Sequence, residues 1–136
     1  KQINPLIGDE IDVWAFGVEA DLLADLVLKG EKTATVSAYD LYALEDEPLP
    51  QEGTFDIILD SRNQAVCIVE ITKVSVQPFH QVSADHAFKE GEGDKSLAYW
   101  RQVHEDFFKD WLGEAGLTFT PDSKVVLEEF RKVYPL

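Results

Sequence analysis

The chain has 136 residues, of which 45% are apolar and 28% charged, and its formal net charge is −14 at pH 7. This length and composition predict a single globular domain over residues 1–136, with its core in residues 12–134. The negative charge argues against duplex DNA and long RNA as partners, because contacts to phosphate supply most nucleic-acid affinity. No apolar run reaches the roughly 20 residues of a membrane helix, so no membrane partner is predicted. The single cysteine, Cys67, excludes an internal disulfide and favours a cytoplasmic location.

The first predicted element is an amphipathic helix over residues 19–29. Residues 1–13 show no regular pattern, and the aromatic residues Trp14 and Phe16 are predicted to lie at the start of this helix. Apolar side chains recur at helical spacing along it, and Gly30 provides a stop signal. Residues 33–38 are rich in β-branched and small side chains and predict a strand or an extended loop.

The middle of the chain is predicted to form a hairpin. Residues 46–53 form a proline-containing loop, residues 54–59 a short strand and residues 60–63 a turn. Residues 65–76 give the longest β-branched stretch and predict a strand that ends before Pro78.

Two helices and a strand complete the chain. Ser83 is the predicted N-cap of a short helix that runs to residue 88. A second long helix begins at Asp94 or Ser96 and continues to residue 112 with an aromatic face, and residues 125–134 form the last strand. Together these elements predict an α+β fold, a small antiparallel or mixed β-barrel with flanking helices.

Two stretches carry the candidate chemistry, Gly30-Glu31-Lys32-Thr33-Ala34-Thr35 and Glu90-Gly91-Glu92-Gly93-Asp94. Lys32 and Thr35 can converge on one point, and the glycines allow the acidic loop to turn toward it. Lysine, hydroxyl and carboxylate suffice for nucleophilic attack without a metal. The alternative is that Lys32 is a solvated residue that offsets the helix dipole, while the acidic loop is a charged turn that caps the next helix.

The histidines and tryptophans give weaker signals. His104 is predicted as a core residue that could border a pocket, while His80 and His86 are predicted at the surface or in caps. Trp14 and Trp100 are candidates to stack on a nucleobase, worth about 1–3 kcal/mol each. No His/Cys cluster indicates zinc and the acidic loop lacks the spacing of a calcium loop, so we predict no metal and no cofactor.

A series of motifs over residues 12–134 also matches one known family. In chain order they are Trp14-Ala15-Phe16-Gly17, Leu26 through Thr35, Leu49-Pro50, Gly53, Val69 through Thr72, Ala87 through Asp94, Ser96-Leu97, Trp100-Arg101, His104, Phe107-Phe108 and a closing strand to Val133. With this pattern the chain resembles the ASCH family of the PUA-like superfamily. The resemblance implies a β-barrel of about five to six strands with helices around a cleft, and a role near RNA or modified nucleosides.

The resemblance also implies particular site residues. Some small bacterial members are amidohydrolases that remove the acetyl group from N4-acetylcytidine, and others are assigned ribonuclease activity. The amidohydrolases use the lysine and threonine of a G-x-K-x-x-T element and a later glutamate, which match Lys32, Thr35 and Glu90. The generic element continues as G-x-K-x-x-E-x-R, where this chain has Thr35 and Ser37, so an arginine that would bind phosphate is missing.

Three functions are compatible with these residues. The first is metal-independent hydrolysis of an acylated nucleoside, in which Lys32 is either the base for Thr35 or a fixed cation for an oxyanion, with Glu90 as base for water. The second is metal-independent RNA cleavage with Glu90 or His104 as base and acid. The third is a non-catalytic module for nucleobases or short single-stranded RNA. The residues predicted to contact the ligand are Trp14, Ser37, Glu92, Asp94, Trp100 and His104.

Overall fold

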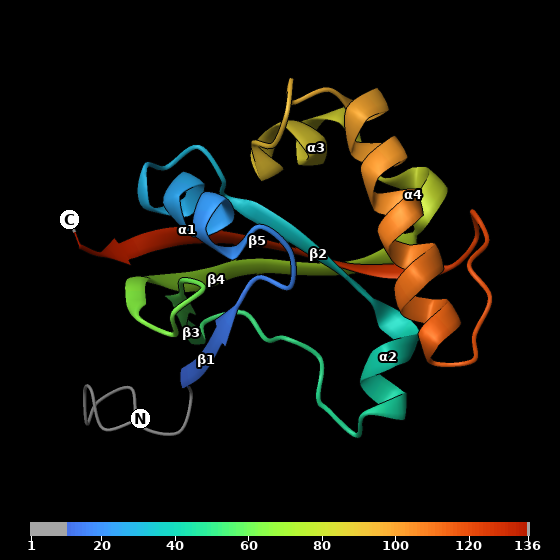
Figure 1. Cartoon of the computed structure of the whole chain (residues 1–136), viewed down its shortest axis with the longest axis horizontal. Helices are drawn as coiled ribbons and strands as arrows, with labels where there is room; N and C mark the ends of the chain where they lie inside the picture. The colour runs from blue at the N-terminus through green and yellow to red at the C-terminus, as the bar shows by residue number, and fades with distance from the viewer. Residues whose placement is uncertain (1–10, 136) are drawn as a thin grey trace.

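In a computed structural model that describes residues 11–135, five strands form one sheet in the order β1-β3-β4-β5-β2. The elements, in chain order, are β1 (Ile11–Ala15), α1 (Ala20–Leu28), β2 (Ala34–Ala38), α2 (Tyr39–Leu44), β3 (Phe55–Leu59), β4 (Ala65–Pro78), the 3-10 helix η2 (Phe79–Gln81), α3 (Ala84–Glu90), α4 (Leu97–Glu114) and β5 (Lys124–Tyr134). The long strands β4 and β5 run side by side across the molecule (Figure 1).

The sheet curls into a half-barrel whose two edge strands are β1 and β2. β1 pairs in parallel with β3, and the other neighbouring strands pair antiparallel. Because β1 and β2 do not pair with each other, the half-barrel stays open between them. The predicted α+β fold, a small barrel-like sheet with flanking helices, is therefore confirmed, and it has five strands.

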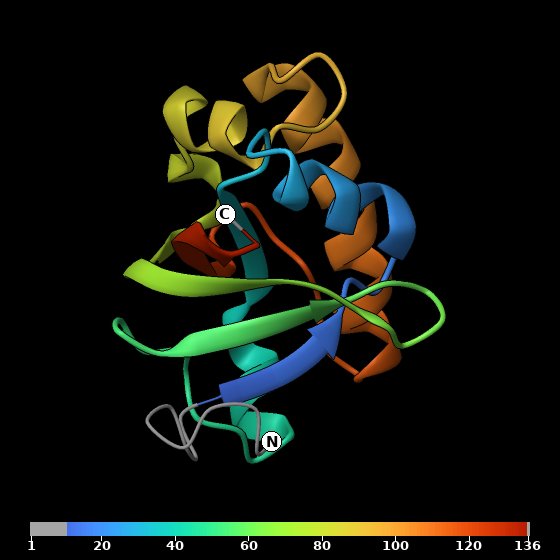
Figure 2. The ribbon, with the colours of Figure 1, turned by 90° about the vertical axis from the view of Figure 1, so that its left-hand side faces the viewer.

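Two apolar clusters hold the helices against the sheet. α1 packs on β3 and β4 mainly through Ala24 and Val27. α4 contributes Trp100 and Phe108 to the second cluster, where both rings contact Phe79. Figure 2 shows α1, α3 and the first turns of α4 above β4. Each large apolar side chain buried in this way contributes roughly 1.5–3 kcal/mol, so these contacts fix the helices that carry the site described below.

Three elements differ from the sequence-based prediction, and one of them is η2, for which no helix was predicted. Residues 11–15, predicted as an irregular approach to the first helix, form the strand β1. Burial does not alternate along β1, where Asp12 and Val13 are both exposed, so the sequence carried no clear strand pattern there. Residues 39–44, for which no helix was predicted, form α2. The prediction for residues 1–10 lies outside the described residues. Along the part of the chain that the structure describes, no helix is long and apolar enough to cross a membrane.

Candidate functional site

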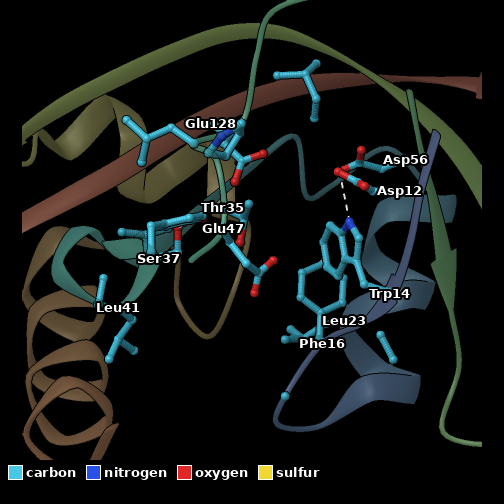
Figure 3. Close-up of a pocket in the computed structure, with 18 of the residues that line it drawn as sticks. Asp12, Trp14, Phe16, Leu23, Thr35, Ser37, Leu41, Glu47, Asp56 and Glu128 are labelled. Atoms are coloured by element: carbon cyan, nitrogen blue, oxygen red, sulfur yellow. Dashed lines mark hydrogen bonds between the residues drawn. The ribbon is translucent and has the colours of Figure 1, made fainter. Parts of the chain in front are cut away.

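A cavity of about 750 Å³ lies in the half-barrel, and both edge strands contribute to its wall. Figure 3 shows Asp12, Trp14 and Asp56 on one side of this cavity and Thr35 and Glu128 on the other. Its remaining walls come from α2, α4, the loop after α2 and the acidic loop. The volume falls within the range of small-molecule sites, roughly 300–1,000 Å³.

Lys32 is held at one end of this cavity by backbone hydrogen bonds on either side of it. Gly30 adopts a left-handed φ of 82° after α1, and the N–H of Lys32 then donates to the carbonyl of Leu26 at 3.1 Å. The N–H of Thr33 donates to the carbonyl of Lys89 near the end of α3 at 2.7 Å. The side chain of Lys32 is 1% exposed as a result, so the alternative of a solvated lysine at a helix end is wrong.

The ammonium of Lys32 lies between the carboxylates of Glu90 and Glu92. Its Nζ is 3.2 Å from Glu90 Oε1 and 2.7 Å from Glu92 Oε2. Glu90 Oε2 lies 2.8 Å from His86 Nε2 and accepts a hydrogen bond from Trp100 Nε1 at 2.7 Å. Burial alone would raise the pKa of Glu90, but Lys32 and the hydrogen bond with His86 hold it at about 2. Glu90 is therefore an ionised carboxylate whose oxygens are occupied by donors, and it is a poor proton acceptor at neutral pH.

The two histidines near Glu90 are both buried. The N–H of His86 donates to the N-cap Ser83, as expected of a residue in a cap, but a surface position is wrong for His86. Its side chain is 5% exposed and bonds to Glu90 four residues later on α3. That i,i+4 spacing places both residues on one helix face, a signal that was present in the sequence. His104 lines the cavity, and its Nδ1 donates to the carbonyl of Trp100 at 2.8 Å, since a carbonyl oxygen can only accept. His104 is thus buried, as predicted, and is also part of the cavity wall.

Glu90, Glu92 and His104 each place one possible ligand atom within 4.8 Å of the others, a spacing compatible with a metal ion. Both carboxylates, however, already pair with the Lys32 ammonium. The positive charge that a divalent cation would bring to this corner is thus supplied by a side chain of the protein.

A second set of acidic side chains, missed by the sequence analysis, also lines the cavity. Trp14 Nε1 donates to Asp56 Oδ2 at 2.9 Å, and Asp56 and Glu128 are 5% and 7% exposed. Burial raises the pKa of Asp56 to about 6. Burial, together with the charges of Asp56 and Asp12, raises the pKa of Glu128 to about 7. These carboxyl groups therefore change charge near neutral pH. The sequence did carry a signal for these two groups, because Asp56 and Glu128 each interrupt an otherwise apolar strand segment, in β3 and β5.

The predicted site residues fall into two groups. Lys32, Thr35, Glu90, Trp14, Ser37, Glu92 and His104 all line the cavity. Trp100 is buried behind Glu90, where its ring stacks on His104 with a centroid distance of 4.4 Å. The Asp94 carboxylate accepts a hydrogen bond from the N–H of Ser96, the N-cap of α4. Neither Trp100 nor Asp94 lines the cavity, and we propose neither as a ligand contact.

Glu128→Gln is expected to stabilise the protein more at alkaline than at acidic pH. The folded-state pKa of Glu128 is raised from 4.5 to about 7, so the folded protein binds more protons than the unfolded chain between these values. Stability therefore falls as pH rises through this window, and glutamine removes that loss. We expect the gain in unfolding free energy to be about 2–3 kcal/mol larger at pH 8 than at pH 5. Urea denaturation at both pH values measures it, with Glu129→Gln as control, and a gain independent of pH would contradict the assignment.

The family of this chain follows from a direct comparison. The family model of the ASCH domain matches residues 12–134. The chain belongs to the ASCH domain family. This confirms the resemblance seen in the sequence motifs.

Solved structures support the same assignment. The ASCH domain from Lactobacillus crispatus JV V101 is 37% identical, with a TM-score of 0.86 over 98% of this chain and 87% of that chain. A protein from Enterococcus faecalis V583 is 41% identical, with a TM-score of 0.82 over 90% of this chain and 76% of that chain. ASCH from Zymomonas mobilis, at 12% identity and a TM-score of 0.58 over 90% of this chain and 67% of that chain, shares the fold. No match was found among curated proteins.

Proposed function

We propose that this ASCH domain is a metal-independent hydrolase of acylated nucleosides such as N4-acetylcytidine. The observation that carries the proposal is the buried ammonium of Lys32 in the wall of the cavity that also contains Thr35. A hydroxyl nucleophile and a fixed cation for the developing oxyanion are the two groups that acyl transfer requires. The cavity of about 750 Å³ is large enough to enclose a nucleoside.

In this proposal Lys32 acts as a fixed cation and not as a base. Its Nζ pairs with both Glu90 and Glu92, and a lysine must lose its proton before it can accept one. Glu90 anchors the ammonium. Thr35 Oγ1 attacks the acetyl carbonyl carbon, and the negative charge that develops on the carbonyl oxygen faces Lys32. Cleavage of the C–N bond releases cytidine, and water then converts the threonine ester to acetate and free Thr35.

Aromatic side chains provide a surface for the base. Trp14 and Phe16 line the cavity and meet edge to face with ring centroids 4.9 Å apart. The Phe16 ring centroid is 5.4 Å from Lys32 Nζ, so the aromatic surface continues to the ammonium. A base that stacks on Trp14 can therefore extend its acylated amine toward Lys32.

The partner we propose is a free modified nucleoside or an unpaired base of a short single-stranded RNA. Besides Glu90 and Glu92, which pair with Lys32, four more acidic side chains line the cavity, those of Asp12, Glu47, Asp56 and Glu128. They disfavour a phosphate inside it, and the arginine of the generic family element is absent. These features count against backbone recognition and against ribonuclease activity.

Thr35→Val is the direct test, because it removes the hydroxyl and keeps the side-chain shape. Incubation of the native protein with N4-acetylcytidine is expected to release cytidine and acetate, and Thr35→Val is expected to lower kcat by at least about 100-fold. Thr72→Val, on β4 and outside the cavity, is the matched control and keeps its activity. Thermal stabilisation by the nucleoside without product would replace the hydrolase with a binding module. Cleavage of a short RNA in the presence of chelator would replace it with a ribonuclease.

A further inference from the structure

Hydrolysis through Thr35 requires a group that accepts the hydroxyl proton. Lys32 is paired with two carboxylates, and the oxygens of Glu90 are occupied by donors from Lys32, His86 and Trp100. These groups are therefore poorly suited to accept the proton, and another side chain of the cavity wall must do so.

Strand register brings one carboxylate next to Thr35. β2 and β5 pair antiparallel, and Thr35 is directly opposite Glu128. Side chains of opposite residues project from the same face of a sheet, with Cβ atoms about 4.5–5.5 Å apart. Both residues line the cavity, and Figure 3 shows them in the same part of its wall.

Glu128 is also free to take up a proton. It is 7% exposed and lines the cavity. Within residues 11–135, no donor bonds to its carboxylate and no partner bonds to the Thr35 hydroxyl. Asp56 and Glu90, the comparable buried acids, do have such donors. The Glu128 oxygens are open to the cavity, since among the described residues no fully buried side-chain oxygen or nitrogen lacks a hydrogen-bond partner. A carboxylate without a bound donor, paired in register with a free hydroxyl, is therefore available to a ligand in the cavity.

We propose that Glu128 is the general base that takes the proton of Thr35, an inference that rests on the proposed hydrolase function. As the bond between Thr35 Oγ1 and the acetyl carbon forms, the proton moves to Glu128 and the carbonyl electron pair moves to the oxygen beside Lys32. Protonated Glu128 then donates this proton to N4 as the C–N bond breaks. Water attacks the resulting ester with Glu128 again as base, which releases acetate and restores the hydroxyl.

The surroundings of Glu128 suit this role. The titratable groups that line the cavity around it are Asp56 from β3, Asp12 from β1, Tyr42 from α2 and Glu47 from the following loop. Burial and the two aspartates raise the pKa of Glu128 to about 7. A base whose pKa lies near the working pH is both partly ionised and strong enough to accept a proton.

His104 is the competing candidate. Its Nδ1 donates to a carbonyl, so in the neutral ring Nε2 is an acceptor. That atom is 3.7 Å from Glu90 Oε1, an oxygen that also pairs with Lys32. His104 lies on α4, whereas Glu128 is paired directly with Thr35 across β2 and β5. Substituting Glu128 and His104 separately distinguishes these two candidate bases.

The test compares pH–rate profiles on N4-acetylcytidine for native protein, Glu128→Gln, Glu129→Gln and His104→Gln. Native kcat is expected to rise with pH through about 7, because Glu128 must be ionised. In Glu128→Gln, kcat is expected to fall by at least about 100-fold and no longer to rise with pH through about 7. KM is expected to change only a few-fold. Glu129 is the adjacent residue and pairs with Lys89. Glu129→Gln is expected to retain the native kcat and its rise with pH. Glu128→Asp is expected to recover part of kcat.

The outcomes distinguish the two proposals. A native-like profile in Glu128→Gln, or loss of the rise in His104→Gln alone, overturns the role of Glu128 and leaves the hydrolase intact. Absence of hydrolysis by the native protein at every pH overturns both. The circular dichroism spectrum and the urea midpoint of Glu128→Gln show that a lost activity does not reflect a lost fold.

Discussion

Replacing Lys32 with alanine is expected to lower the free energy of unfolding by about 3–5 kcal/mol at pH 7, because it leaves a buried charge without its cation. Glu90 is 1% exposed, and its pKa of about 2 keeps it ionised. Urea denaturation measures the loss. Lys29→Ala is the matched control, since Lys29 pairs with Asp25 at 2.9 Å but both side chains are exposed, and it is expected to lower the free energy of unfolding far less than Lys32→Ala.

A double variant and a pH series show whether the loss comes from the orphaned charge. Lys32→Met combined with Glu90→Gln removes both charges and is expected to be more stable than Lys32→Ala. The depressed pKa of Glu90 contributes stability above pH 4.5 that disappears as pH falls toward 2, so the difference between native protein and Lys32→Ala is expected to shrink in that range. Equal losses for Lys32→Ala and Lys29→Ala would mean that the buried pair contributes nothing beyond a surface pair.

The sequence located the groups around Lys32 but could not show how they are held. Lys32 and Glu90 are 58 residues apart, and no local pattern predicts their contact. Their convergence was a hypothesis from the residue types and the glycines of the acidic loop, and the family resemblance supported it. The structure supplies the physical cause, a backbone hydrogen bond from Thr33 to Lys89 that ties the end of α1 to the end of α3.

The convergence of three further acidic side chains on the cavity could not be predicted from the sequence, for a different reason. Asp12, Asp56 and Glu128 come from β1, β3 and β5, and their convergence depends on the order and curl of the sheet. The helical periodicity of α4 was predicted well, yet it could not show that the indole N–H of Trp100 turns toward Glu90. Periodicity identifies a buried face, but it does not specify what a polar atom on that face will contact.

Gly91 allows the end of α3 to lie against the backbone of Glu31, just before Lys32, and Gly91→Ala is expected to disrupt this contact. Gly91 is the C-cap of α3 with a left-handed φ of 73°. A Cβ at this position would meet the backbone carbonyl of Glu31, the residue before Lys32. Because that neighbour is backbone, the acidic loop has to move away from the end of α1 and with it from the Lys32 ammonium.

Gly116→Ala separates this close approach from the cost of the backbone conformation. Gly116 has a φ of 78° with open space around it, so its substitution carries only the left-handed strain of about 1–2 kcal/mol. Gly91→Ala is expected to cost about 1–3 kcal/mol more in urea denaturation, as overpacked sites do. It is also expected to lower hydrolysis of N4-acetylcytidine, whereas Gly116→Ala leaves hydrolysis unchanged. Equal losses of stability would show that the loop can separate from α1 without cost, and the Lys32 ammonium would then lack the rigid support that oxyanion stabilisation requires.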